Sequence, residues 1–333
     1  MTAEPLDERK MADGRTLRIL RYVSPGDEVP EPVVRYVAGS LGFDSYDAGI
    51  RPQAYWRCWY RESFDGLLDG VASHLYVAEV DGEFAARLWF AYSRASGFGN
   101  FGNVFTEPGF RRLGLMEALL APCMADFEAA RDARILCCGT GSRFVAEAYR
   151  RHGFRLTYGG EFGPMARTRR PGEDFRSIER EAFADARLAS IRPGRPDDQF
   201  VTDKFIAHTA PVLDRLGVRR GPAAAVPDFM TARIEAEAGG GALLVACNAA
   251  GTVTGHAFAL ASGGAGLLDF TAHAASFPDV PELIRATARA FHGRHDMDLL
   301  FHAFPGDAEK TAAVLAAGGR RLAHASRLEI YSL

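Results

Sequence analysis

The stretch Val104-Phe-Thr-Glu-Pro-Gly-Phe-Arg-Arg-Leu-Gly-Leu-Met-Glu117 joins an apolar, β-prone run to a basic turn and the start of a helix. The helix is expected to run from residue 115 to residue 130, directly after Gly114. A strand, a tight turn and a helix in this order present backbone N–H groups and the positive end of the helix dipole to an anion such as phosphate. Because glycine has no Cβ, Gly114 lets the backbone approach such a ligand closely. The stretch therefore predicts a phosphate-binding turn.

This turn resembles a known ligand-binding signature. Residues Arg111-Arg-Leu-Gly-Leu-Met116 are similar to the acyl-CoA signature of the GNAT superfamily of N-acetyltransferases, which reads Arg or Gln, two residues, Gly, one residue, and Gly or Ala. Met116 departs from this pattern, because the last position normally holds a small residue. The resemblance implies that acetyl-CoA or another acyl-CoA binds here as a substrate. The cofactor-binding residues that it implies are Val104, Phe105, Thr106, Arg111, Arg112, Leu113, Gly114, Leu115, Met116, Glu117 and Ser142.

A second stretch downstream fits the same family. Residues 134–138 predict a short buried strand, and residues 142–152 predict a helix that ends at Gly153, a residue type common in the left-handed position after a helix. In the family, a Tyr four residues before a Gly-Phe pair lies near the sulfur of coenzyme A and often acts as general acid. Tyr149 has this spacing from Gly153 and Phe154. The resemblance implies that Tyr149 is catalytic, and the alternative is an ordinary half-buried aromatic residue on a helix.

The resemblance also implies the reaction. In the family, backbone N–H groups of the splayed fourth strand bind pantetheine and polarise the thioester carbonyl, which corresponds to Val104, Phe105 and Thr106 here. The general base is not identified, since the positions where the family often carries an acid hold Cys137 and the glycine-rich residues 97–103. That glycine-rich run is expected to be either a loose loop or a strand lying against pantetheine and substrate. A water chain, His74, His256 or Asp269 could remove the proton.

The predicted elements occur twice along the chain. Each set has the same order: strand, helix, hairpin, strand, helix, strand, helix and strand. The similar runs Gly153-Phe-Arg-Leu156 and Gly319-Arg-Arg-Leu322 lie near the ends of the two sets. We therefore expect an α/β (α+β) fold of two tandem acyl-CoA N-acyltransferase-type domains, each with a mixed, mostly antiparallel sheet flanked by helices. The expected boundaries are 1–170 for the catalytic domain, 171–187 for a linker and 188–333 for a degenerate second domain, and the charges of residues 159–187 are expected to be solvated.

The two halves differ in their chemistry. The second half contains no Arg-x-x-Gly turn, and its equivalent stretch, residues 269–282, places Asp279 and Glu282 where a pyrophosphate would need positive potential. Alignment of the two closing runs sets Leu315 opposite Tyr149. We therefore expect that only the first half binds acyl-CoA. The second half is then a scaffold, a wall of the substrate site or a dimer surface.

Composition limits the remaining possibilities. The chain has 333 residues and a net charge of −3, which does not favour nucleic acid as a partner. It has neither an apolar run of the roughly 18 residues that a membrane span requires nor an N-terminal signal peptide. The five cysteines lack metal-ligand spacing and suggest reduced thiols and a cytoplasmic protein without a metal. The expected partner is a small-molecule amine acceptor, and a homodimer is possible.

The predicted function is N-acyl transfer, most simply acetyl transfer, from acyl-CoA to the amine of a small molecule. Two alternatives keep the fold: a donor carried on an acyl carrier protein, and a non-catalytic acyl-CoA sensor. A third alternative, a dinucleotide-binding turn at Gly139-Thr-Gly-Ser-Arg-Phe144, is disfavoured because Phe144 replaces the third glycine and no acidic residue follows at the required distance. The sequence does not identify the acceptor.

Overall fold

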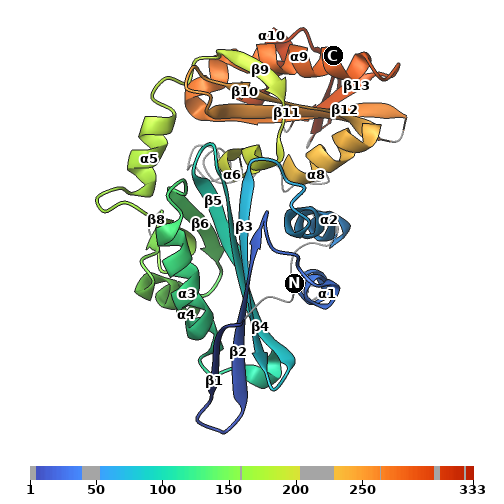
Figure 1. Ribbon diagram of the computed structural model, residues 1–333. Coiled ribbons are helices and arrows are strands. Elements are labelled where there is room, and N and C mark those ends of the chain that lie inside the picture. The colour runs from blue at the N-terminus through green and yellow to red at the C-terminus, as the bar shows by residue number, and fades with distance from the viewer. Residues whose placement is uncertain are drawn as a thin grey trace. The chain divides into compact units, whose positions relative to one another are not determined.

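The computed structural model describes residues 5–39, 53–157, 160–202, 229–262, 264–303, 308–325 and 328–333. The chain divides into two compact units, the first made of residues 1–45 and 56–178 and the second of residues 46–55 and 179–333. Each unit is built around one mixed, mostly antiparallel sheet with flanking helices (Figure 1). The expected fold class is therefore confirmed.

The first unit contains an eight-stranded sheet in the order β1-β2-β3-β4-β5-β6-β8-β7. Among the described strands of this unit, only β5 and β6 pair in parallel. The β3–β4 hairpin turns at Asp81 and Gly82, which both have positive φ angles and form the turn that the sequence predicted. The strands are β1 (Pro5–Lys10), β2 (Thr16–Ser24), β3 (Val71–Val80), β4 (Glu83–Ser93), β5 (Phe98–Thr106), β6 (Ile135–Thr140), β7 (Arg155–Leu156) and β8 (Gly163–Thr168).

Strand β1 was not predicted from the sequence. It pairs antiparallel with β2 at the edge of the sheet. Five of its six residues are exposed, so the run Pro5-Leu-Asp-Glu-Arg-Lys10 lacks the apolar alternation that identifies a half-buried strand.

Helices cover both faces of this sheet (Figure 1). One face carries α1 (Glu31–Gly39) and α2 (Gln53–Phe64), and the other carries α3 (Leu115–Ala129) and α4 (Arg143–Arg151). Helix α3 buries Leu119, Leu120, Cys123 and Phe127 in the main core of the unit. The ring of Phe127 contacts Phe90 of β4 edge-on, so α3 is held firmly on the sheet that it follows.

The second unit repeats this topology. Its seven-stranded sheet has the order β14-β15-β13-β12-β11-β10-β9, which is the order of β2 to β8 in the first unit. The only parallel pair among its described strands, β12 with β13, corresponds to β5 with β6. The strands are β9 (Ser190–Pro193), β10 (Gly241–Cys247), β11 (Val253–Ser262), β12 (Ala265–Ala272), β13 (Leu299–Ala303), β14 (Arg320–Ala325) and β15 (Leu328–Ser332). The tandem arrangement is thus visible in the strand order itself.

Helix α5 (Phe175–Ala182) lies at the division between the units. Its C-terminal end is held within the second unit, because the Asn248 side chain donates to the carbonyl oxygens of Ala182 and Asp185. The other described α-helices of this unit are α6 (Gln199–Val201), α8 (Phe229–Glu235), α9 (Val280–His292) and α10 (Ala308–Ala316). Most of the helix expected over 200–213 lies outside the described residues.

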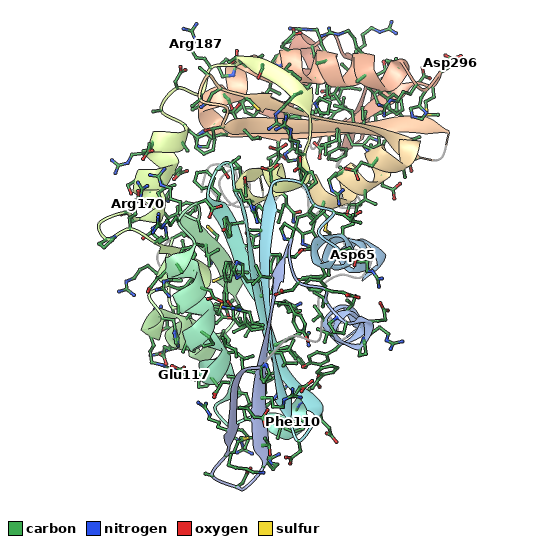
Figure 2. The ribbon with its side chains drawn as sticks, viewed as in Figure 1. Asp65, Phe110, Glu117, Arg170, Arg187 and Asp296 are labelled. Carbon is green, nitrogen blue, oxygen red and sulfur yellow. The ribbon has the colours of Figure 1, made fainter. Side chains whose placement is uncertain are left out.

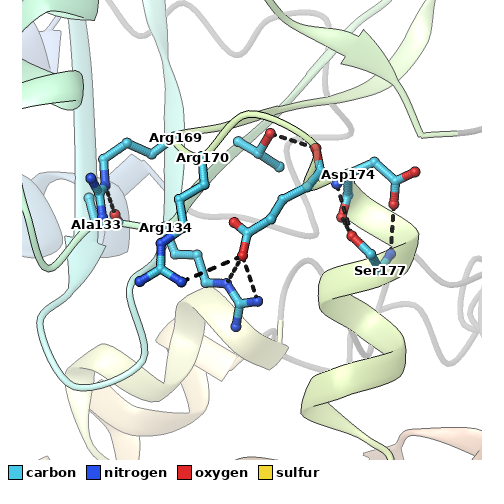
Figure 3. A network of polar contacts seen from close by, with 8 residues as sticks. Ala133, Arg134, Arg169, Arg170, Asp174 and Ser177 are labelled. Atoms are coloured by element: carbon cyan, nitrogen blue, oxygen red, sulfur yellow. Dashed lines mark hydrogen bonds and ion pairs between the residues drawn. The ribbon is translucent and has the colours of Figure 1, made fainter.

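The charges that follow β8 make specific contacts, contrary to the expectation that they are solvated (Figure 3). Arg134, just before β6, pairs with Glu173 at 2.9 Å, and Arg170 lies 3.8 Å from the same carboxylate. Arg169 donates to the carbonyl oxygen of Ala133 at 2.6 Å. These contacts fasten the segment after β8 to the loop before β6, so this part of the expected linker belongs to the first unit.

Candidate functional site

Strands β5 and β6 diverge in the middle of the first sheet. They pair only from Phe98 opposite Ile135 to Asn100 opposite Cys137. Beyond that point β5 stays paired with β4 as far as Thr106, and β6 stays paired with β8 as far as Thr140. The facing edges of residues 101–106 and 138–140 therefore have no strand between them in the part of the chain that the structure describes. Such an edge can bind an extended ligand through its N–H and C=O groups.

The glycines of β5 have different roles near this opening. A Cβ at Gly99 would collide with the carbonyl oxygen of Ala91, so Gly99 permits close contact between β5 and β4. Gly97 has φ +73° and would place a Cβ 2.7 Å from the carbonyl oxygen of Asp132. Residues 98–106 form a strand, so the glycine-rich run is not a loose loop.

A β-bulge interrupts β5 beside the opening. Arg87 is opposite Phe105 and Trp89 is opposite Gly102, so Leu88 alone faces two residues of β5, Asn103 and Val104. Asn103 has φ +50°, in the left-handed region that few residues other than glycine adopt. A bulge of this kind bends a strand and redirects its peptide groups, and bulges are common next to active sites.

The turn after β5 has the geometry that an anion site requires. A short 3-10 turn, Pro108–Phe110, leads to Gly114, which has φ +75° and precedes the first residue of α3. No side chain caps this helix, and the N–H groups of its first turn have no carbonyl partner within the helix. A Cβ at Gly114 would meet no protein atom within 4 Å. The turn thus presents free N–H groups to open space.

Two of the predicted residues support the turn through contacts of their own. The Nε of Arg111 donates to the carbonyl oxygen of Thr106 at 3.3 Å, which links the turn to the end of β5. Met116, which departs from the family signature, is partly buried and packs against the main core of the unit. Because its side chain contacts the core, Met116 does not need to occupy the ligand's side of the turn.

Tyr149 lies on α4, the helix that follows β6. Its ring contacts Phe101 edge-on at 5.2 Å and Phe154 at 5.7 Å, and it is a member of the main core. Burial raises the pKa of Tyr149 well above its ordinary value of about 10. The phenol is therefore protonated at neutral pH, as a proton donor must be.

The predicted residues form two groups, one on each side of the opening. The first group comes from β5, the turn and the first residues of α3, and the second group is Ser142 and Tyr149 at α4. Ser142 precedes α4, and its N–H donates to Oγ1 of Thr140 at 3.1 Å. Its side chain makes no capping hydrogen bond.

A side-chain contact that the sequence did not predict joins α3 to α4. Glu117, in the first turn of α3 (Figure 2), lies 2.9 Å from Nε2 of His152 at the end of α4. Arg151 is 3.7 Å from the other carboxylate oxygen. The Glu117 carboxylate therefore faces α4, where Arg151 compensates its negative charge.

We expect His152→Ala to weaken binding of coenzyme A by about two- to fivefold, because loss of one side-chain hydrogen bond costs about 1 kcal/mol. Calorimetric titration with coenzyme A measures this change. Arg61→Ala is the control, since Arg61 on α2 forms exposed pairs with Asp65 and Glu31 on the other face of the sheet. Unchanged affinity in His152→Ala would show that the pair does not position the turn.

One of the suggested proton acceptors in the first unit, His74, is not placed at this opening. His74 lies on β3, which β4 separates from β5, and it stacks on Phe90 with ring centroids 4.3 Å apart. Burial lowers the pKa of His74 to about 4, although Asp126 opposes this shift. His256 and Asp269 are buried within the second unit.

The second unit has a corresponding divergence with different contents. Strands β12 and β13 pair only as far as Leu268 opposite Phe301. Next to this point, Nζ of Lys310 on α10 lies 2.6 Å from Asp269 and 5.0 Å from the ring centre of Phe270. Both charged side chains are almost fully buried. Protein side chains therefore occupy the place where the first unit has its opening.

The start of α9 also differs from that of α3. Its second residue is Pro281, which has no N–H to offer. Asp279 accepts a hydrogen bond from the N–H of Leu188, and Glu282 pairs with Arg285. Hydrogen bonds from Arg285 and then Arg289 lower the pKa of Glu282, so it stays negatively charged. Leu315, aligned with Tyr149, is half exposed.

Comparison with known proteins finds a family similarity in the first half of the chain. Residues 44–154 match the sequence profile of the acetyltransferase (GNAT) family. No curated protein matches the chain.

Three solved structures illustrate the similarity in fold. An acyl-CoA N-acyltransferase from Pseudomonas aeruginosa is 15% identical, with a TM-score of 0.34, and the match covers 46% of this chain and 99% of that one. A phosphinothricin acetyltransferase from Sinorhizobium meliloti, in complex with AcCoA, is 15% identical with a TM-score of 0.34, covering 44% and 88%. An acetyl transferase from Salmonella typhimurium that modifies the N-terminal serine of ribosomal protein L7/L12 is 18% identical with a TM-score of 0.33, covering 46% and 94%.

No described helix combines the length and the apolar character needed to cross a membrane. No group of three or more His, Cys, Asp or Glu side chains in the described ranges is arranged to hold a metal ion.

Proposed function

We propose that the first unit is an N-acyltransferase, most simply an N-acetyltransferase, which moves an acyl group from acyl-CoA directly to the amine of a small molecule. The observation that carries this proposal is the free edge of β5, which leads into the uncapped N-terminus of α3. An extended pantetheine arm can pair with the edge while the pyrophosphate binds the N–H groups of the turn.

The donor would contact three successive parts of the chain. Val104, Phe105 and Thr106 offer backbone groups to pantetheine, and residues 111–117 surround the pyrophosphate. Arg111 and Arg112 add positive charge at the turn. Ser142, on the opposite side of the opening, is available to a polar group of the donor through its uncommitted hydroxyl.

The chemistry follows from positioning and polarisation. The amine attacks the thioester carbonyl, and a C–N bond forms as the C–S bond breaks. Backbone N–H groups of the β5 bulge stabilise the negative oxygen of the intermediate. Tyr149, which is protonated at neutral pH, gives its proton to the departing thiolate. A water molecule or the acceptor's surroundings would take the proton that the amine loses.

The second unit would support this site without a cofactor of its own. Its Lys310–Asp269 pair and the proline at the start of α9 argue against an acyl-CoA site there. We propose residues 1–170 as the catalytic domain, 171–187 as the linker and 188–333 as the degenerate domain. We also propose a cytoplasmic protein that acts on a small-molecule amine, with a homodimer as one role for the second unit.

The proposal is tested by a transfer assay with acetyl-CoA and a panel of small amines, in which release of free thiol and formation of the acylated amine are both measured. The expected result is equal amounts of thiol and acylated product. A carrier-protein donor that outcompetes acetyl-CoA would replace the proposed donor. Tight binding of acetyl-CoA without transfer to any amine would instead support a sensor.

A further inference from the structure

Arg87 is a buried charge in the middle of an otherwise apolar strand. It lies on β4 and is 2% exposed. Its Nε donates to Oδ1 of Asn103 at 2.9 Å. Its guanidinium also lies over the rings of Phe105, at 4.8 Å, and of Tyr36 on α1, at 5.0 Å. Burial lowers the pKa of Arg87, and Tyr36 opposes this shift. These contacts fix the guanidinium against β5.

The two contacts on β5 are on either side of Val104. Asn103 precedes Val104 and Phe105 follows it, and Asn103 and Val104 are the two bulged residues. Asn103 has φ +50°, a conformation that persists only where its surroundings enforce it. The Arg87 guanidinium can enforce this conformation, because one rigid planar group makes both a hydrogen bond to Asn103 and a ring contact to Phe105. Tyr60 contributes as well, since its hydroxyl interacts with the side chain of Asn103.

We propose that Arg87 is a positioning residue that holds the β5 bulge in the conformation in which the peptide groups around Val104 bind the thioester carbonyl of the donor. This inference rests on the proposed function, because only an acyl donor at the edge of β5 gives the bulge a carbonyl to polarise. Arg87 itself touches neither the donor nor the reacting atoms. Its effect on the reaction passes through Asn103 and Phe105.

Two substitutions at Asn103 separate positioning from folding. Asn103→Gly keeps a residue that adopts positive φ but removes the oxygen that accepts from Arg87. Asn103→Asp also tolerates positive φ and restores an acceptor for Arg87. Arg87→Lys keeps the charge but loses the planar group. Arg18→Lys on β2, which β3 separates from β4, is the control because Arg18 pairs with Glu79 and Glu8 instead.

The readout is the infrared carbonyl band of acetyl-CoA labelled with carbon-13 at the thioester carbon, recorded with the full chain and needing no acceptor. In the wild-type protein and Arg18→Lys, we expect binding to shift the band to lower frequency, the mark of a polarised carbonyl. Asn103→Gly and Arg87→Lys should lose most of that shift with little change in donor affinity, and Asn103→Asp should regain it. Turnover should fall about tenfold to a hundredfold in the first two, within the range for loss of one oxyanion donor.

The outcomes distinguish this inference from the proposed function. If the wild-type protein does not bind acetyl-CoA, the proposed function fails. If it binds acetyl-CoA and shifts the band, but Asn103→Gly and Arg87→Lys shift it equally, then Arg87 does not position the bulge. An unshifted band in the wild-type protein with normal turnover would also overturn the inference.

Discussion

Replacing Gly114 with Val should abolish binding of acyl-CoA, with a loss of affinity greater than about a hundredfold. Gly114 has φ +75°, which a β-branched residue adopts only with strain. The new side chain would also extend into space that contains no protein atom within 4 Å, where the pyrophosphate would approach the N–H groups of α3. Calorimetric titration with acetyl-CoA and with coenzyme A measures the effect.

Gly109→Ala provides a matched control in the same turn. A Cβ at Gly109 also meets no atom within 4 Å, but Gly109 does not have a positive φ angle. The control should therefore retain most of the donor affinity. Similar affinities for Gly114→Val and the wild-type protein would remove the turn from the binding site.

Removing the hydroxyl of Tyr149 should have the second largest effect. Tyr149→Phe should lower turnover by roughly tenfold to a thousandfold, because loss of general-acid assistance typically costs about 10² to 10⁴ in rate. The affinity for acyl-CoA should be nearly unchanged, since the ring would still pack against Phe101 and Phe154. Turnover is measured with the best amine of the panel, and donor affinity by calorimetry.

The pH dependence and a second tyrosine strengthen this test. Because burial raises the pKa of Tyr149 above about 10, its ionisation should not reduce turnover anywhere in the neutral range. Tyr92→Phe is the control, since it removes a buried hydroxyl that binds Asp132 elsewhere in the unit. If Tyr149→Phe turns over as fast as Tyr92→Phe, Tyr149 is only a core residue.

The parts of the site that could be predicted are local in sequence. The spacing of Arg111 from Gly114, and of Tyr149 from Gly153, lies within single turns whose geometry a few residues determine. The succession of strands and helices along both units also followed from the repeated sequence patterns, whereas the order of the strands within each sheet was not predicted. Assignment of roles to these residues remains a prediction.

The parts that escaped prediction depend on contacts between distant segments. Glu117 meets His152 across two helices, and Arg87 meets Asn103 across a bulge whose register the sequence does not reveal. Arg87 could have been noticed as a lone charge in an apolar strand, but its partner could not. Lys310 and Asp269 are likewise far apart in the sequence, with 41 positions between their residue numbers.

A structure of the full chain with coenzyme A tests the account most directly. The account predicts one molecule per chain, with pantetheine along residues 104–106 of β5 and the pyrophosphate at the N–H groups that follow Gly114. Coenzyme A bound between β12 and β13, or bound in the first unit away from the free edge of β5, would contradict it.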